Sequence, residues 1–281
     1  MESWDKFDAL VRDLDGWAFR GQKKATWKLF SLLSRYLQDF VPDRTVWEKR
    51  EARAIRIFRR KAHNYINDPR TLDGDLRCLA LMQHHGAPTR LIDFTKSPYV
   101  AAFFALESAI DDASIYAVNT PILWQKLPIG LTDLTHEIID PRNPGSFNKF
   151  FAANKYELVW TGEPREMDRR LLAQSGTFVI PGVLEKPVED ILLSYQSTEP
   201  LIRKFILPAR KIRSVFMRSL YRMNITNATL FPDLEGLAKS VAVELEMEWQ
   251  GVAPASNLDD PQFLRDREKA FHSTPKLSDD L

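Results

Sequence analysis

Residues 84–98 form the stretch on which the fold depends, and they read His84-His85-Gly86-Ala87-Pro88-Thr89-Arg90-Leu91-Ile92-Asp93-Phe94-Thr95-Lys96-Ser97-Pro98. The residues before them, 75–82, carry apolar side chains at helical spacing and predict a helix that ends near Gly86. Residues 89–94 are rich in β-branched and aromatic side chains, which is typical of a short strand. A second helix is predicted to begin with Ser97 as its N-cap, and residues 99–110 are apolar nearly all round, which predicts that this helix is buried.

This predicted helix–strand–helix corner concentrates polar groups: two adjacent histidines, Arg90, Asp93 and Thr95. The second helix also presents unpaired N–H groups and the positive end of its dipole at the corner, which favours the binding of an anion. Plainer interpretations remain open. In one of them, Asp93 only pairs with Arg90 or caps a turn of the backbone. In the other, a histidine stands at the end of the helix only because the helix dipole favours it there.

The composition restricts the class of protein. With 281 residues, of which 44% are hydrophobic, the chain can bury a substantial core in one large domain or two small ones. The net charge of +1 predicts no general attraction to nucleic acid or to a membrane. The single cysteine, Cys78, lies on an apolar predicted helix and suits a reducing compartment. Because the sequence has no long apolar run and no signal-peptide pattern, we expect a soluble cytoplasmic protein.

Upstream of the corner, residues 3–14 predict an amphipathic helix, and residues 17–22 predict a strand that runs into a turn at Gly21. Arg20 lies near the end of this strand, where its side chain points either into a cleft or into solvent. Residues 29–35 are predicted to be a short connecting segment.

A long helix is predicted over residues 45–65, and it places Arg53, Arg56 and Arg60 on one face because they follow one another at helical intervals. This basic face is either a solvated surface or a strip that follows the phosphates of a nucleic acid. No aromatic residue is interleaved with these arginines, so the stacking of bases is not predicted.

Downstream of the corner, further strands are predicted at residues 114–118, 156–160, 177–180 and 205–207. Helices are predicted at residues 169–174 and 211–222, and from residue 231 to about 248. The prolines in residues 121–146 predict an irregular excursion, and residues 251–281 predict a flexible tail. Since the gaps between strands are unequal, we predict an α+β fold with a small, mostly antiparallel sheet and flanking helices rather than a regular βαβ repeat.

Four groups of residues carry a resemblance to a known family. They are Phe19-Arg20-Gly21-Gln22; the central stretch from Gln83 to Pro98 with Ala101-Ala102-Phe103-Phe104-Ala105 after it; Arg170-Leu171-Leu172-Ala173-Gln174-Ser175-Gly176-Thr177-Phe178; and Leu230-Phe231-Pro232-Asp233-Leu234-Glu235-Gly236-Leu237. In this order they closely resemble the FRG domain family, which is named after its Phe-Arg-Gly motif.

The resemblance to the FRG family implies one domain over residues 1–250, with a helical insertion at about 45–66 and a tail at 251–281. FRG proteins are found in bacteria and phages, and some resemble parts of toxin or antiphage systems. The resemblance therefore implies a partner such as an antitoxin or a phage trigger protein.

A fainter resemblance links three of these segments to ADP-ribosyltransferases of the Arg-Ser-Glu type. Those enzymes carry an arginine at the end of the first strand, a Ser-Thr-Ser strand that leads into a helix, and a glutamate or Gln-x-Glu on a later strand. Phe19-Arg20-Gly21 resembles the first motif, and Asp93-Phe94-Thr95-Lys96-Ser97 resembles the second. Gln174-Ser175-Gly176 stands in the place of the third, with Gly176 where the glutamate would be. This resemblance implies an ADP-ribosyltransferase-like core that uses NAD as its substrate.

The chemistry of NAD suggests roles for these residues. An arginine fork such as that of Arg20 pairs with a phosphate bidentately, and Thr95 or Ser97 beside a helix N-terminus donates hydrogen bonds to ribose or phosphate oxygens. Cleavage of the nicotinamide bond builds oxocarbenium character, which a carboxylate, Asp93 first and Glu235 second, would stabilise. A histidine of the adjacent pair would serve as the general base.

The candidate catalytic residues are therefore Arg20, His85, Asp93, Thr95, Gln174 and Glu235. The candidate residues for binding NAD are Arg20, Gly21, Gln22, His84, Arg90 and Ser97. Gln174 and Glu235 also have a plainer interpretation as polar groups at helix ends. A metal site is disfavoured, because the adjacent histidines point about 100° apart on a helix and the spacing matches no recognised metal pattern.

Two functions remain open from the sequence. The first is an ADP-ribosyltransferase or NAD glycohydrolase that acts on a macromolecule. The second is a non-catalytic module that binds a nucleotide or a nucleic acid through the corner and through Arg53, Arg56 and Arg60. The glycine at position 176 favours the second function.

Overall fold

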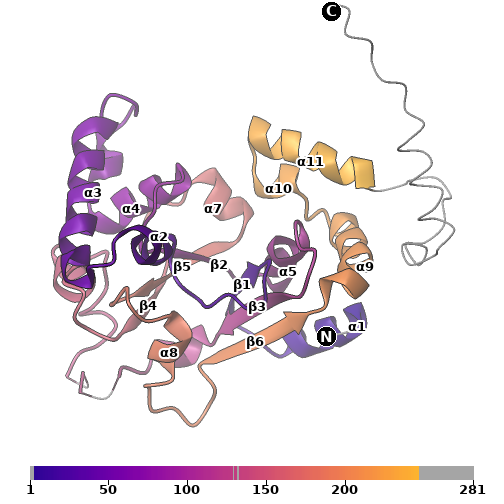
Figure 1. Ribbon diagram of the computed structural model, residues 1–281, viewed down its shortest axis with the longest axis horizontal. Helices are drawn as coiled ribbons and strands as arrows, with labels where there is room; N and C mark the ends of the chain where they lie inside the picture. The colour runs from indigo at the N-terminus through magenta and orange to yellow at the C-terminus, as the bar shows by residue number, and fades with distance from the viewer. Residues whose placement is uncertain (1–2, 129, 132, 247–281) are drawn as a thin grey trace, which may run out of the picture.

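The computed structural model describes residues 3–128, 130–131 and 133–246, and its centre is an antiparallel sheet with the strand order β4-β5-β2-β1-β3-β6 (Figure 1). In these residues the strands are β1 (Ala18–Gln22), β2 (Ile92–Thr95), β3 (Ala113–Val118), β4 (Val159–Gly162), β5 (Gly176–Pro181) and β6 (Ile202–Leu207). Neighbouring strands run antiparallel throughout. The predicted α+β class, with an antiparallel sheet and flanking helices, is therefore confirmed.

Helices flank the sheet and connect its strands. They are α1 (Trp4–Arg12), α2 (Leu32–Phe40), α3 (Trp47–Ala62), α4 (Asp75–His84), α5 (Pro98–Leu106), α6 (Thr120–Leu123), α7 (Arg169–Ala173), α8 (Val188–Leu192), α9 (Ala209–Arg222), α10 (Asn227–Leu230) and α11 (Leu234–Glu246). Figure 1 shows α1, α5 and α9 on one half of the sheet and α2, α3 and α4 on the other. The predicted tail at 251–281 lies outside the described residues.

The two halves of the sheet meet at β1 and β2, and they diverge there. β1 pairs with β3 along all of Ala18–Gln22, whereas it meets β2 where Phe19 lies opposite Thr95. β2 in turn pairs with β5 along all of Ile92–Thr95. The divergence leaves space between β1 and β2 on one side of their meeting point.

Alternation along the strands divides the hydrophobic core, because successive side chains point to opposite faces of a sheet. Phe19 packs into a core around α5, with residues of α1, β3 and α9. Ala18 belongs instead to a core that contains Ile92 and Phe94 of β2 and residues of α8. A further core joins α4, β4 and β5 with Ile55 of α3, so the long helix is anchored to the rest of the fold.

The predicted connecting segment at 29–35 is wrong, since it contains the start of α2. Ser31 is the N-cap of this helix, and its hydroxyl accepts a hydrogen bond from the backbone N–H of Ser34 at 3.0 Å. The buried residues Leu33 and Leu37 lie one helical turn apart. The apolar pattern of α2 therefore continues past residue 35, beyond the segment that was predicted to be a connection.

Strand β2 begins at Ile92, later than the predicted start at Thr89. The carbonyl oxygen of Thr89 accepts a hydrogen bond from the backbone N–H of Leu33 at 3.1 Å, and its hydroxyl accepts one from Leu91 at 3.2 Å. Thr89 is thus bound to the beginning of α2 rather than to a neighbouring strand.

The predicted turn at Gly21 is also wrong, because β1 continues through Gln22 and Gly21 lacks a positive φ. Gly21 is required for a different reason. A Cβ atom at this position would lie 2.0 Å from the carbonyl oxygen of Ala101 and 2.5 Å from the backbone nitrogen of Ala105. The glycine therefore allows β1 to pack directly against the backbone of α5.

Candidate functional site

A cavity of about 220 Å³ opens where β1 and β2 diverge, and α5 and α7 complete its walls. It is lined by Phe19, Arg20, Gly21, Asp93, Phe94, Thr95, Phe104, Arg170 and Gln174. A smaller pocket of about 40 Å³ adjoins it, since Asp93, Arg170 and Gln174 line both. Three segments that are distant in sequence, namely β1, the central corner and the end of α7, therefore meet at one cavity.

Arg20 is half-buried at the wall of this cavity. Its Nη1 donates a hydrogen bond to the carbonyl oxygen of Asp93 at 2.6 Å, so the side chain crosses from β1 to β2. Its Nε is buried and has no hydrogen-bond partner among the described residues, and no carboxylate of those residues forms an ion pair with it. Burial lowers the pKa of Arg20, and the nearby charge of Asp93 opposes this effect. A cationic group with a buried donor that lacks both a hydrogen-bond partner and an ion pair favours an anionic ligand.

The carboxylate of Asp93 is held by the helix that precedes the corner. Its Oδ2 accepts a hydrogen bond from Nε2 of Gln83 in α4 at 3.0 Å, and the hydroxyl of Thr89 donates to the same Gln83 side chain. Asp93 is exposed, whereas its neighbours in β2 are buried. The alternative pair with Arg90 does not form, because Arg90 is engaged elsewhere.

The two histidines of the corner lie in different surroundings. His84 lines the smaller pocket, and its Nδ1 lies 3.3 Å from Oδ2 of Asp168. His85 is the exposed C-cap of α4, and its ring lies edge-on to that of His84 with 4.9 Å between the ring centroids. Of the pair, His84 is therefore the one beside Asp93.

The hydroxyl groups of Thr95 and Ser97 bond to the backbone. Thr95 donates to the carbonyl oxygen of Gln174 at 2.7 Å and accepts from the N–H of Ser97 at 3.0 Å, so it joins β2 to the end of α7. Ser97 is the N-cap of α5, as predicted, and accepts from the N–H of Val100 at 3.3 Å. Thr95 lines the cavity, but Ser97 does not.

The end of α7 forms the wall opposite Arg20. Nε2 of Gln174 donates to the carbonyl oxygen of Leu230 at 3.1 Å. One turn earlier, the guanidinium of Arg170 lies over the ring of Phe231, 4.6 Å from the ring centroid. The ring of Phe231 also contacts that of Phe104, with 6.0 Å between the centroids. Phe231, in the connection between α10 and α11, thus packs against two residues that line the cavity.

Gly176 packs closely against α7 at the place that a glutamate takes in the Arg-Ser-Glu pattern. It pairs with Thr95 in the ladder between β2 and β5. A Cβ atom at position 176 would lie 2.4 Å from Cδ1 of Leu171 in α7. A side chain at position 176 would require Leu171 to shift, and because a glycine stands there, any catalytic carboxylate at this cavity has to come from another position.

Several of the sequence-based candidates do not line the cavity. Arg90 is fully buried and pairs through two hydrogen bonds with the carboxylate of Glu51, one of them 2.7 Å long. Gln22 is buried on β1, further along the strand than Gly21. Glu235 is exposed on α11 and pairs with Lys239 of the next turn at 2.6 Å.

Arg170 and Phe104 line the cavity, although they were not among the predicted site residues. For Arg170 a signal was present, because it precedes Gln174 by one helical turn and so shares its side of the predicted helix. For Phe104 no signal was present, since an apolar residue on a buried helix is typical of the core.

The cavity brings together two guanidinium groups, one carboxylate and one amide beside the aromatic ring of Phe104. Guanidinium groups suit phosphate and carboxylate ligands, while an aromatic wall suits a flat ring. Cavities that enclose a drug-sized ligand measure roughly 300–1,000 Å³. The smaller volume here therefore suits one end of a nucleotide rather than a whole dinucleotide.

The basic face of α3 lies apart from the residues that line the cavity. Arg53, Arg56 and Arg60 are exposed and line a shallow hollow with Ile57 and Arg59. Within the described ranges none of these three forms an ion pair, whereas Arg59 pairs with a carboxylate of α4 at 2.8 Å. The face is thus open to an anionic partner.

The protein is an α+β protein in which an antiparallel sheet is flanked by helices and the central strands β1 and β2 diverge at Arg20. The sequence profile of the FRG domain matches residues 15–114, so an FRG domain is present in the chain. The matched region contains Arg20, Asp93 and Thr95, while Arg170 and Gln174 lie beyond it. No curated protein and no solved structure matches the chain. In the part of the chain that the structure describes, none of the helices combines the length and the apolar character needed to span a membrane.

Proposed function

We propose that this protein binds NAD at the cavity between β1 and β2 and acts as an ADP-ribosyltransferase-like enzyme or an NAD glycohydrolase. The observation that carries the proposal is the buried Nε of Arg20 at the wall of the cavity, which lacks a hydrogen-bond partner among the described residues. Arg170 supplies a second cation there, so the cavity suits one end of a ligand that carries phosphate. Given the cavity volume, the nicotinamide and its ribose would lie inside and the adenosine outside.

Asp93 is the proposed catalytic carboxylate, because its side chain lines the cavity and Gly176 supplies no carboxylate on β5. In the reaction the bond between the ribose carbon and the nicotinamide nitrogen breaks, and its electron pair leaves with the nicotinamide. The carboxylate of Asp93 would stabilise the positive charge that develops on the ribose. The oxygen or nitrogen of the acceptor then bonds to the ribose carbon and loses its proton to a base, for which His84 is the nearest candidate.

The proposal is tested by calorimetric titration of the folded chain with NAD and with ADP-ribose. Arg20→Lys and Arg170→Ala should each weaken binding at least about tenfold, or 1.4 kcal/mol, because each loses a planar, bidentate donor. Arg169→Ala is the matched control, since Arg169 is exposed on the same helix and does not line the cavity. Absence of binding at millimolar NAD, or equal binding by all three variants, would reject the site.

Catalysis is measured separately, as the release of nicotinamide from labelled NAD with RNA, DNA and protein acceptors. Asp93→Asn should retain binding within a few-fold and lose at least about a hundredfold in rate, the size expected for a group that stabilises charge in the transition state. Unchanged turnover in Asp93→Asn would remove the carboxylate from the mechanism.

The toxin or antiphage setting implied by the FRG resemblance is part of this proposal. Expression of the chain in a bacterial host should slow growth, and Asp93→Asn should relieve the effect. Equal growth inhibition by both chains would separate any toxicity from the proposed reaction.

A second candidate function is nucleic-acid binding by the basic face of α3. It is favoured by Arg53, Arg56 and Arg60, which are exposed and form no ion pair among the described residues. Binding of a labelled single-stranded RNA should weaken steeply with salt, with a log–log slope of about −0.7 per phosphate contacted. Replacing all three arginines with glutamate should abolish it, while Asp93→Ala should leave it unchanged.

A further inference from the structure

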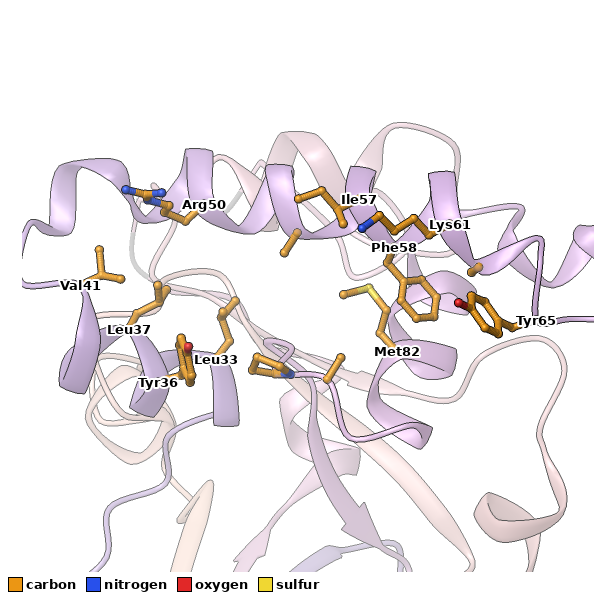
Figure 2. Close-up of a pocket in the computed structure, with 14 residues that line it drawn as sticks. Leu33, Tyr36, Leu37, Val41, Arg50, Ile57, Phe58, Lys61, Tyr65 and Met82 are labelled. Atoms are coloured by element: carbon orange, nitrogen blue, oxygen red, sulfur yellow. The ribbon is translucent and has the colours of Figure 1, made fainter.

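A groove lined mainly by apolar side chains runs along α3, and it shares no lining residue with the cavity between β1 and β2 (Figure 2). It encloses about 610 Å³ between α2, α3 and the end of α4. Ile57 and Phe58 of α3 lie on one side of the groove, and Leu33 and Leu37 of α2 with Met82 of α4 lie on the other. The groove thus has three helices as its walls and is open along its length.

The groove exposes large apolar side chains that would ordinarily be covered. Tyr36 retains 51% of its accessible surface, Ile57 retains 38% and Tyr65 retains 87%. A continuous exposed apolar surface is typical of an interaction site. Tyrosine, phenylalanine, methionine and arginine, which line this groove, are also the residues enriched at the centres of protein interfaces.

The charges at the rim indicate the chemistry of the occupant. Arg50 and Lys61 line the groove near the two ends of the α3 segment in Figure 2, and both are exposed. Neither forms an ion pair with any residue that the structure describes. A partner that places apolar side chains in the groove would therefore meet positive charge at both ends, which carboxylates would complement.

We propose that this groove binds an acidic amphipathic helix of a partner protein. From Arg50 to Lys61 the helix α3 rises about 16 Å, so an occupant of about three turns would match its length. Such a helix would direct apolar side chains at intervals of three and four residues into the groove and acidic side chains toward its rim. The proposal does not depend on NAD binding at the cavity.

The probe for this proposal is a phage-displayed library of sixteen-residue helical peptides with a Glu/Ala frame and varied apolar residues on one face. The library is selected on the immobilised full chain, and the affinity of the selected peptides is measured by fluorescence anisotropy. A second library with a Lys/Ala frame serves as the charge control. We expect binders from the acidic frame and none from the basic frame.

Variants of the full chain then test whether the selected peptides bind in the groove. Ile57→Glu should weaken binding at least tenfold, and so should the double change Arg50→Glu with Lys61→Glu. Arg60→Glu is the matched control on α3, since Arg60 does not line the groove, and it should change affinity less than threefold. The substituted side chains are exposed, and circular dichroism checks that each variant is folded.

Other occupants would appear as distinct results that overturn the proposal. Displacement of the probe by a synthetic peptide of residues 247–281 would assign the groove to the chain's own end. Dimerisation that Ile57→Glu abolishes, measured by sedimentation equilibrium, would assign it to a second copy, and displacement by RNA would assign it to nucleic acid. Failure to select any acidic peptide, or equal binding to the Ile57→Glu chain, would remove the site.

Discussion

Each residue of the Phe-Arg-Gly motif has a separate physical task. Phe19 packs into the core around α5, and Arg20 reaches across to β2 and the cavity. Gly21 brings β1 into contact with the backbone of α5. The motif therefore joins packing and chemistry in three consecutive residues, because alternate side chains of a strand point in opposite directions.

Gly21→Ala should destabilise the protein by about 2 kcal/mol or more, since the added methyl group meets backbone atoms that cannot rotate away. Gly86→Ala is the control. At Gly86 φ is +80°, and an added Cβ atom would meet no atom within 4 Å outside the adjacent residues. Only the conformational cost of about 1–2 kcal/mol therefore applies. Urea denaturation measures both variants, and an equal or smaller loss for Gly21→Ala would contradict the steric explanation.

The buried pair of Glu51 and Arg90 gives a second prediction at this scale. Both side chains are at most 2% exposed, so Glu51→Ala would leave a buried cation without its partner and should cost about 3–5 kcal/mol. Changing both residues to methionine should cost less than the sum of the single changes. Glu157→Ala, which breaks an exposed pair with Lys186, should cost below about 1 kcal/mol. Additive losses at Glu51 and Arg90 would contradict the coupling.

His136 makes stability depend on pH. It is 4% exposed, its ring stacks on Trp124, and burial lowers its pKa from the ordinary value of 6.5. Below pH 6.5 His136 binds a proton in the unfolded chain but stays neutral in the folded chain. The contribution of neutral His136 to stability is therefore complete above pH 6.5, and it falls as the pH drops toward the lowered pKa. His136→Gln should flatten the stability curve in this range, and an unchanged slope would contradict the assignment.

At the scale of elements, the central corner joins α4, β2, α5 and α7. Gln83 of α4 holds Asp93 of β2, and Thr95 of β2 holds the carbonyl of Gln174 at the end of α7. The sequence predicted the three consecutive elements of this corner because their signals, a helix stop and an N-cap, are local. Such local signals did not predict the contact with α7, since it joins residues that are distant along the chain.

Ser97→Ala tests the role of the N-cap of α5. It should lower stability by about 1 kcal/mol and leave NAD binding unchanged, because the hydroxyl accepts from Val100 and does not line the cavity. Ser97→Asp should retain the stability, since aspartate also caps helices. A loss of NAD affinity without a loss of stability would return Ser97 to the candidate binding residues.

At the scale of the whole molecule, the FRG match covers less than the folding unit. The matched residues 15–114 contain β1 and β2 and reach the start of β3, yet β2 pairs with β5 and β3 pairs with β6, both of which lie beyond the match. The cavity likewise needs Arg170 and Gln174. The sheet and the site therefore include strands and residues that lie beyond the match.

A fragment of residues 15–114 should consequently fail to fold by itself. It would remove β5 from the side of β2 and most of β3 from the side of β1, and it would expose core residues that pack on α9, β5 and α8. Calorimetry should show a cooperative transition for the full chain and none for the fragment, and amide NMR signals of the fragment should have little dispersion. A cooperative transition in the fragment would contradict this view of the fold.

The sequence by itself determined the α+β class, the helix–strand–helix corner and the N-cap at Ser97, because hydrophobic periodicity and capping act between residues that are close along the chain. Only the tertiary structure decided that Arg90 pairs with Glu51, that Gly176 packs against Leu171 of α7, and that Arg170 joins the cavity. These outcomes depend on how strands and helices pack across long separations, where the volume and charge of a neighbour decide what a residue can do.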